Sequence, residues 1–330
     1  WAVIREGVWD LSTGRNAVCA AGLAFFLLAG CSPKPASMEG EAVIKAEYTQ
    51  GQIMVIAATE RNRYQNVYTS QLWQVQADAE GNTFEEVLKD QMGRFLVELA
   101  TVDQMAEEQE MELTGQEEDA VNALSQEYYS GLSQGDLDYM DVSLDEVEEL
   151  YLMYYRADKL AEELTRDQDL EVSDAEAKVI DVLQIQLETR EEAEEVLAEV
   201  RAEGADFAAL GARYSGDSQI SRSMEWSEDM DALGQAAFSL EQDEVSGIVE
   251  QDGAYYILKC SNAYDQEATA ERKELLAREK KSQAFRALYE PYAAEHQVVL
   301  APDVWDSVDF AQGEGCTTDN FFSLYRSYFP

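Results

Sequence analysis

Hydrophobic residues recur at three- and four-residue steps through much of the first half of the chain. One such stripe consists of Phe84, Val87, Leu88, Met92, Phe95, Leu96 and Leu99. A second stripe consists of Val147, Leu150, Tyr151, Met153 and Tyr154. This spacing places the side chains of each stripe on one face of a helix. Residues 43–170 are therefore predicted to be mostly helical.

Polar residues mark where some of these helices begin. Thr114 and Ser143 are each followed three residues later by a glutamate, which is the pattern of the capping box. In a capping box the hydroxyl and the carboxylate satisfy N–H groups at the start of a helix. A third match begins at Ser173, and the hydrophobic pattern changes just after it.

A different pattern runs from residue 176 to residue 263. Residues 178–187 are rich in Val, Ile and Leu and predict a strand. The elements predicted after it are helices at residues 191–201, 206–214 and 233–238, and a closing strand at residues 254–259. Strands and helices mixed in so short a segment indicate a small α+β domain.

The last part of the chain returns to a helical pattern. A helix is predicted at residues 271–295, and residues 298–300 predict a short strand. Residues 311–330 are expected to be a loosely ordered tail, in which the pattern assigns no role to the aromatic residues. These are Phe321, Phe322, Tyr325, Tyr328 and Phe329.

The long apolar run of the chain lies near its beginning and ends at a cysteine. Arg15 precedes residues 17–29, a run of the length found in export signals and shorter than the roughly 20 residues that span a bilayer. Leu-Leu-Ala-Gly at residues 27–30, directly before Cys31, resembles the lipobox of bacterial lipoprotein precursors. This resemblance implies that residues 1–30 are a signal peptide and that the Cys31 sulfur carries a diacylglyceryl group.

The lipobox resemblance sets the expected location of the protein. Residues 31–40 contain Pro33 and Pro35 and are expected to be a tether. The protein is thus expected to be extracytoplasmic and lipid-anchored to a bacterial membrane, with the choice of membrane left open. An ordinary export signal and a coincidental apolar helix are the alternatives.

Charge narrows the range of partners. The chain has 24 Lys and Arg against 67 Asp and Glu, a formal net charge of −43. Such a surface repels nucleic acid and anionic lipid headgroups, so neither is expected as a partner. Because 46% of the residues are hydrophobic, the chain is expected to fold. The charge is first of all a solvated surface; cation binding and the solubility of a binding surface are the alternatives.

Histidine and cysteine usage excludes several kinds of chemistry. The single histidine, His296, leaves no His-based zinc site and no Ser-His-Asp triad to assemble. Neither a metal nor a cofactor is expected. Cys19 lies in the predicted signal, and whether Cys260 and Cys316 pair or stay free is left open.

Four stretches within residues 176–263 resemble the parvulin family of peptidyl-prolyl isomerases. They are residues 188–193, residues 204–210 with 214–217, residues 236–240 with 244–249, and residues 254–259. The resemblance implies a four-stranded antiparallel sheet wrapped by helices. The layout of the whole chain is similar to the PrsA/SurA group of extracytoplasmic foldases. This likeness implies that residues 41–175 and 264–310 form one helical chaperone-like domain with the parvulin-like domain inserted.

The parvulin family also implies where the site lies. It places two histidines on adjacent central strands, with an Asp or Cys nearby. Matched by position, the histidines fall on Gln184 and Tyr256, and Asp217 takes the Asp/Cys position. A pair of glycines in the family reads Arg222-Ser223 here. A loop or cap role for Asp217, and a strand role for Tyr256, are the alternatives.

The family's apolar floor for the proline ring is partly kept. The positions that match or adjoin it are Met224, Met230, Leu233 and Phe238. Plain core packing is the alternative role for all of them.

The expected function follows from these resemblances. The leading hypothesis is a membrane-anchored folding factor that binds unfolded or newly exported proteins and proline-containing peptides, with catalysis weak or lost. An active isomerase that uses Asp217, Gln184 and Tyr256 is the second hypothesis. A surface scaffold without client binding is the third. Whether the protein forms a homodimer is left open.

Overall fold

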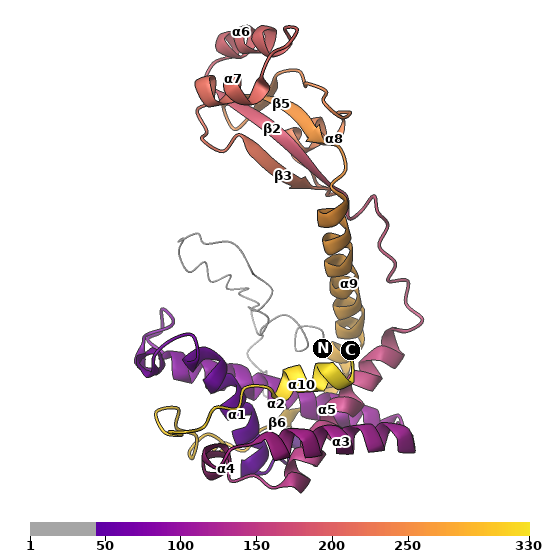
Figure 1. Ribbon diagram of the computed structural model, residues 1–330. Coiled ribbons are helices and arrows are strands. Elements are labelled where there is room, and N and C mark those ends of the chain that lie inside the picture. Colours follow the sequence, from indigo (N-terminus) through magenta and orange to yellow (C-terminus); the bar gives the residue numbers. More distant parts are fainter. Residues whose placement is uncertain (1–43) are drawn as a thin grey trace. The chain divides into compact units, whose positions relative to one another are not determined.

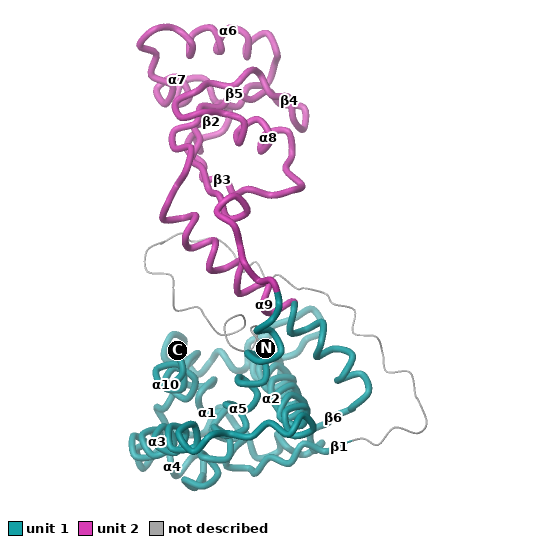
Figure 2. The backbone as a smooth tube through the Cα atoms, turned by 90° about the vertical axis from the view of Figure 1, so that its right-hand side faces the viewer, with its two compact units in different colours: residues 1–168, 284–330 teal, residues 169–283 magenta. Residues whose placement is uncertain are grey.

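The computed structural model describes residues 44–330 and divides into two compact units (Figures 1 and 2). The helical unit consists of the described residues up to 168 together with residues 284–330, and the sheet unit consists of residues 169–283. The predicted signal, the tether and Cys31 lie outside the described residues. Among residues 44–330, no helix is both long enough and apolar enough to cross a membrane.

The helical unit is built from segments at both ends of the described chain. Its helices are α1 (Gln50–Gln65), the 3₁₀ helix η2 (Ser70–Gln74), α2 (Phe84–Glu108), α3 (Gly115–Gly131), α4 (Gln134–Met140), α5 (Leu144–Thr165), the end of α9 (Gln266–Glu295) and α10 (Phe321–Tyr328). Strand β1 (Ile44–Lys45) pairs in parallel with β6 (Val298–Val299), so the first described residues lie beside the segment that follows α9.

The two predicted capping boxes are confirmed. Thr114 and Ser143 each directly precede a helix. The hydroxyl of each accepts a hydrogen bond from the backbone N–H three residues later, and its own backbone N–H donates to the carboxylate of the glutamate there. Burial raises the pKa of Glu117, but the Thr114 N–H and Lys159 outweigh burial and bring the pKa to about 2. Ser173 and Glu176 make the same two hydrogen bonds, but no helix follows them. The residues between them form a turn, and strand β2 begins soon afterwards at Val179. The Ser173 N–H brings the pKa of Glu176 to about 2.

The expectation of a loosely ordered tail at residues 311–330 is wrong. Residues Phe321–Tyr328 form helix α10, and Phe321 and Tyr325 are fully buried. The ring of Phe321 stacks on Tyr151 at 4.1 Å, and Tyr325 meets Tyr154 edge-on at 4.5 Å between centroids. The aromatic spacing in the tail is therefore that of a helix face, and its partners lie on α5, far away in the sequence.

The sheet unit contains the predicted four-stranded antiparallel sheet. The strands are β2 (Val179–Leu187), β3 (Ser221–Glu225), β4 (Val249–Gln251) and β5 (Ala254–Asn262), in the order β3-β2-β5-β4. Helices α6 (Arg190–Val200) and α7 (Phe207–Tyr214) pack on one face, where Ile185 and Ile257 are buried. Helix α8 (Ala232–Phe238) packs on the other face, over Val182 and Leu258. We call this second surface the α8 face.

Candidate functional site

Gln184 and Tyr256 lie on the α8 face of the two central strands. Side chains alternate along a strand, so Gln184 shares this face with Val182, and Tyr256 shares it with Leu258. Gln184 pairs with Leu258, and Tyr256 pairs with Gln186. The two side chains are therefore diagonal neighbours, and Gln184 is buried at 4% exposure while Tyr256 is half-buried.

Asp217 lies in the loop between α7 and β3, and hydrogen bonds join this loop to strand β2. The N–H of Gly216 donates to the carbonyl of Gln186 at 2.8 Å, and the N–H of Gln186 donates to the Ser215 hydroxyl at 3.0 Å. The N–H of Gln184 donates to the carbonyl of Ile220 at 2.7 Å. These bonds hold Asp217 next to the strand that carries Gln184.

Arg222 is a member of the site that the sequence interpretation did not include. It pairs with Val182 across β3 and β2, so its side chain lies on the α8 face. Its Nη2 donates to Oδ2 of Asp217 in an ion pair. The sequence offered a signal, because the resemblance to the parvulins had matched Arg222 to one of the family's glycines.

Both carboxylate oxygens of Asp217 have partners. The N–H of Gln219 donates to Oδ1 at 2.9 Å, and this bond is the main reason that the pKa of Asp217 is lowered. The Arg222 guanidinium lowers the pKa further. Asp217 is therefore a charged, paired carboxylate and not a free proton donor or acceptor.

The guanidinium of Arg222 is incompletely satisfied. Its Nε is buried and has no hydrogen-bond partner among the described residues. An unsatisfied buried donor costs about 1–3 kcal/mol. Arg222 thus holds Asp217 at a cost.

Three of the four expected floor residues lie in one cluster. Met224, Leu233 and Phe238 are half-buried and pack against the apolar residues of the α8 face. Met230 lies outside this cluster and packs at the start of α8, where a Cβ at Gly234 would be 3.1 Å from its Cβ and Cγ atoms. The α8 face therefore combines an apolar floor with the polar groups of the site.

The chemistry available on this face is hydrogen bonding and apolar contact. Rotation about an X–Pro bond must overcome a barrier of roughly 18–20 kcal/mol and needs no nucleophile. A Gln amide such as that of Gln184 and a Tyr hydroxyl such as that of Tyr256 are each able both to donate and to accept hydrogen bonds. Within residues 44–330, no group of three or more His, Cys, Asp and Glu side chains could hold a metal ion.

Residues 181–262 match the family model of the PPIC-type PPIase domain, called rotamase. The resemblance of the sheet unit to the parvulins is therefore confirmed, and this segment is a parvulin-type domain. Among proteins with curated descriptions, none matches the chain.

Solved structures of PrsA proteins are also similar to the chain. The foldase PrsA of Streptococcus pneumoniae is 21% identical, with 70% of this chain and 97% of that chain covered and a TM-score of 0.26. PrsA of Bacillus subtilis is 21% identical over 71% and 96%, with a TM-score of 0.25. The peptidylprolyl isomerase PrsA of Bacillus cereus is 18% identical over 75% and 96%, with a TM-score of 0.36. Likeness at this level says nothing about the activity of this chain.

Removing the Arg222 guanidinium should raise the pKa of Asp217. We expect Arg222→Ala to move this pKa part of the way towards that of an ordinary aspartate, because the Gln219 N–H remains. A carboxyl titration followed by NMR measures it. Arg213→Ala is the control, since that guanidinium lies over the Tyr214 ring. An unchanged pKa in Arg222→Ala would show that the ion pair does not hold Asp217.

Proposed function

We propose that this chain is a lipid-anchored, extracytoplasmic folding factor whose parvulin-type domain binds proline-containing segments of unfolded exported chains and isomerises them slowly or not at all. One observation carries the proposal. Gln184 and Tyr256, which we match by position to the family histidines, lie on the α8 face, and Asp217 is paired with Arg222. Three of the four residues that we match to the family's apolar floor, Met224, Leu233 and Phe238, pack beside them.

This combination favours binding over turnover. Catalysis of isomerisation requires polar groups that stabilise the twisted amide more than the planar one. Gln184 and Tyr256 offer hydrogen bonds but no imidazole ring of the kind that the family uses. Asp217 is already in an ion pair with Arg222. Binding of a proline ring on the apolar floor is still favourable, because the free energy of burying apolar surface does not depend on the polar groups.

An active isomerase is the second candidate. It is favoured by Asp217, which stands at the family position and is fastened beside β2 on the side of Gln184. Tyr256 and Gln184 would then supply the hydrogen bonds to the rotating amide. The two candidates share the site and differ only in whether the transition state is bound more tightly than the ground state.

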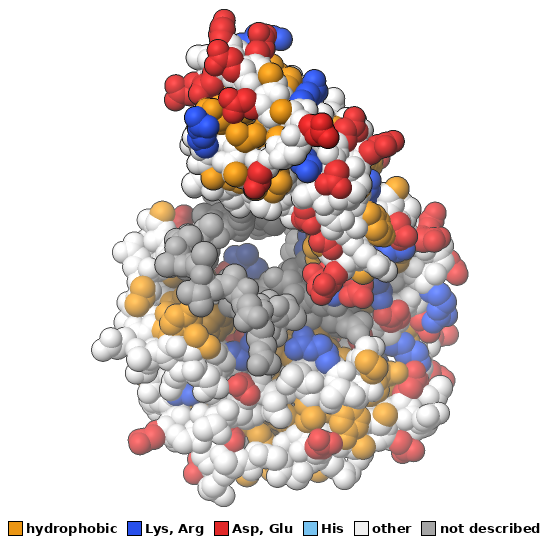
Figure 3. All heavy atoms as spheres, turned by 45° about the horizontal axis from the view of Figure 1, so that its top comes forward, with side chains coloured by type: hydrophobic (Ala, Val, Ile, Leu, Met, Phe, Trp, Pro, Cys, Tyr) orange, Lys and Arg blue, Asp and Glu red, His pale blue; other side chains and the backbone are white. Residues whose placement is uncertain are grey.

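The acidic surface fits a protein that holds unfolded chains. On the face drawn in Figure 3, acidic side chains lie interspersed with hydrophobic ones. A net charge of −43 keeps exposed apolar surface soluble and repels acidic proteins. Unfolded segments that are neutral or basic are therefore the preferred clients.

Client binding is tested by aggregation. The chain from Ser32, added to chemically unfolded citrate synthase during refolding, should lower light scattering in proportion to its concentration. Met224→Gln places an amide in the apolar floor and should weaken the effect several-fold. Ser221→Thr, an exposed change on the same strand, should leave it unchanged. Undiminished aggregation, with no binding to unfolded chains, would remove the folding-factor proposal.

Isomerase activity is tested by restoring the family histidines. In a protease-coupled assay with an Ala-Pro peptide, wild type and Asp217→Ala should both stay near the uncatalysed rate. Gln184→His combined with Tyr256→His should raise the rate at least about tenfold, which corresponds to about 1.4 kcal/mol of transition-state binding. Gln186→His is the matched control on the same strand. A clear wild-type rate that Asp217→Ala abolishes would instead support the second candidate.

The anchor is tested at the mature N-terminus. The short apolar run and the residues before Cys31 support cleavage at that cysteine and lipidation of its sulfur. Mass spectrometry of protein isolated from bacterial membranes should find a diacylglyceryl group on Cys31, and Cys31→Ser should release the protein into the soluble fraction. An unmodified thiol at residue 31 would contradict the anchor.

A further inference from the structure

Arg222 lies between the apolar floor and the polar groups of the α8 face. On β3 it is two residues from Met224, a member of the floor, which is a distance of about 7 Å along a strand. It pairs with Val182 on β2, and Gln184 is the next residue of β2 on the same face. A peptide whose proline ring lies on the floor therefore has its main chain within reach of the long Arg222 side chain.

The Arg222 guanidinium has donors that the protein does not use. Its Nη2 donates to Asp217. Neither Nε nor Nη1 has a hydrogen-bond partner among the described residues; Nε is buried and Nη1 is not. The side chain as a whole is 37% exposed. Because a guanidinium cannot lose its charge in a protein, a cationic donor remains available here for an acceptor from outside the chain.

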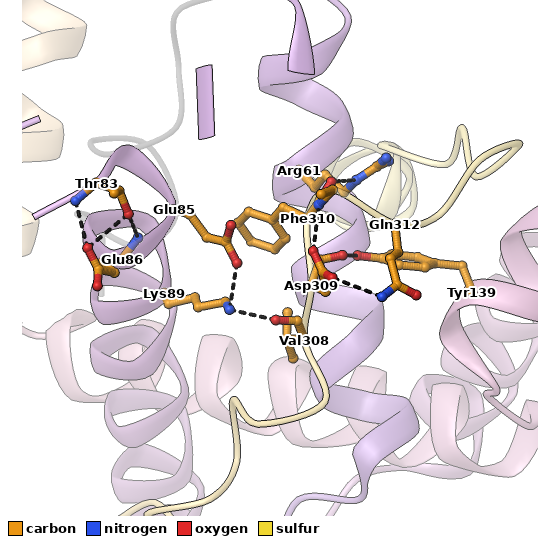
Figure 4. Close-up of polar contacts among 11 residues, drawn as sticks. Arg61, Thr83, Glu85, Glu86, Lys89, Tyr139, Val308, Asp309, Phe310 and Gln312 are labelled. Atoms are coloured by element: carbon orange, nitrogen blue, oxygen red, sulfur yellow. Dashed lines mark hydrogen bonds and ion pairs between the residues drawn. The ribbon is translucent and has the colours of Figure 1, made fainter. Parts of the chain in front are cut away.

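Other arginines of the chain show which acceptor suits such a donor. In the helical unit, Nε of Arg61 donates to the main-chain carbonyl of Phe310 at 2.9 Å (Figure 4). In the sheet unit, Nη2 of Arg201 donates to the main-chain carbonyl of Ser246 at 2.8 Å. Among the described residues, no carbonyl plays this part for Arg222. A carbonyl of a bound peptide would take this place.

Charge favours a neutral acceptor over an acidic one. The Asp217 carboxylate already balances the charge of Arg222, and the whole chain carries a net charge of −43. This field repels a peptide carboxylate, whereas a carbonyl accepts a charge-assisted hydrogen bond without adding a negative charge. The acceptor that fits Arg222 is therefore an amide oxygen in the main chain of the peptide.

The amide before proline responds to such a bond in a particular way. Resonance in the planar amide places negative charge on the oxygen, and this resonance is lost when the C–N bond twists. A cationic donor at the oxygen therefore binds the planar amide more tightly than the twisted one. Because catalysis requires the opposite preference, this donor raises affinity and slows rotation.

We propose that Arg222 binds the carbonyl oxygen of the residue before proline, so that the α8 face holds X–Pro bonds in their planar form and does not turn them over. Asp217 is the positioning residue in this arrangement, because it holds the guanidinium from a loop that is bonded to β2. The inference rests on the proposed function and deepens it, since it names the group that separates binding from turnover.

The first test uses the full chain and two fluorescein-labelled Ala-Ala-Pro-Phe peptides that differ in one atom. One has the normal carbonyl oxygen before proline, and the other has sulfur there, which is a weaker acceptor. Loss of a charge-assisted hydrogen bond should make wild type bind the sulfur peptide at least about fivefold more weakly than the oxygen peptide. Arg222→Ala should bind the two peptides alike. Ser221→Thr, on the same strand, is the matched control and should keep the wild-type ratio.

The rate of rotation in the bound peptide is the second readout, and a merely structural role would not move it. The oxygen peptide, enriched in the cis form by a trifluoroethanol solution of lithium chloride, is diluted into an excess of protein, and its relaxation is followed. Wild type should relax no faster than the free peptide. Arg222→Ala should bind more weakly and yet relax several-fold faster when saturated. Arg222→Ala with Asp217→Asn should do the same, which separates the effect from catalysis by a freed carboxylate.

The outcomes distinguish this inference from the proposed function. A wild type that binds the oxygen peptide, with a peptide ratio that Arg222→Ala leaves unchanged, overturns the role of Arg222 and leaves the folding factor intact. A lost ratio without faster relaxation also overturns the inference, because the bond then does not discriminate between planar and twisted amides. A lost ratio together with faster relaxation supports it. Absence of binding to wild type removes peptide binding by the parvulin-type domain, and the proposed function and this inference fall together.

Discussion

Burial of aromatic rings between residues far apart in the sequence holds the helical unit together. Tyr151 on α5 stacks on Phe321, and Trp73 packs against Phe310, so both ends of the described chain share one core. The sheet unit lies between them in the sequence. Because the entropy of closing a loop grows only slowly with its length, a whole domain can be inserted in such a loop at little extra cost.

The site in the sheet unit depends on strand register. Alternation puts Gln184, Tyr256 and Arg222 on the same face as the apolar floor, and a slip of one residue would turn each of them to the other face. The bonds between the Asp217 loop and β2 involve main-chain atoms and Ser215, so they hold the loop independently of the side chains of Gln184 and Tyr256.

The sequence predicted those features that local spacing determines. Helix starts at Thr114 and Ser143 follow from residues three apart, and β2 follows from its β-branched run. Strand β3 was not predicted from the pattern, because Ser221–Glu225 is short and mostly polar and forms only as a partner of β2. Helix α10 was missed because its aromatic residues are buried against α5, which lies far away in the sequence. Arg222 was passed over for a similar reason, since only strand pairing brings it onto the α8 face.

Two glutamates with lowered pKa values affect how the folded chain responds to acid. A chain this acidic gains relief from self-repulsion when its ordinary carboxylates take up protons around pH 4. Glu117 and Glu176, whose pKa values are about 2, remain ionised there. A depressed pKa contributes stability that is fully present above the unfolded pKa and is lost progressively as the pH falls from there through the folded pKa. Acidification towards pH 4 therefore reduces self-repulsion while these two carboxylates of the folded chain keep their charge and their hydrogen bonds.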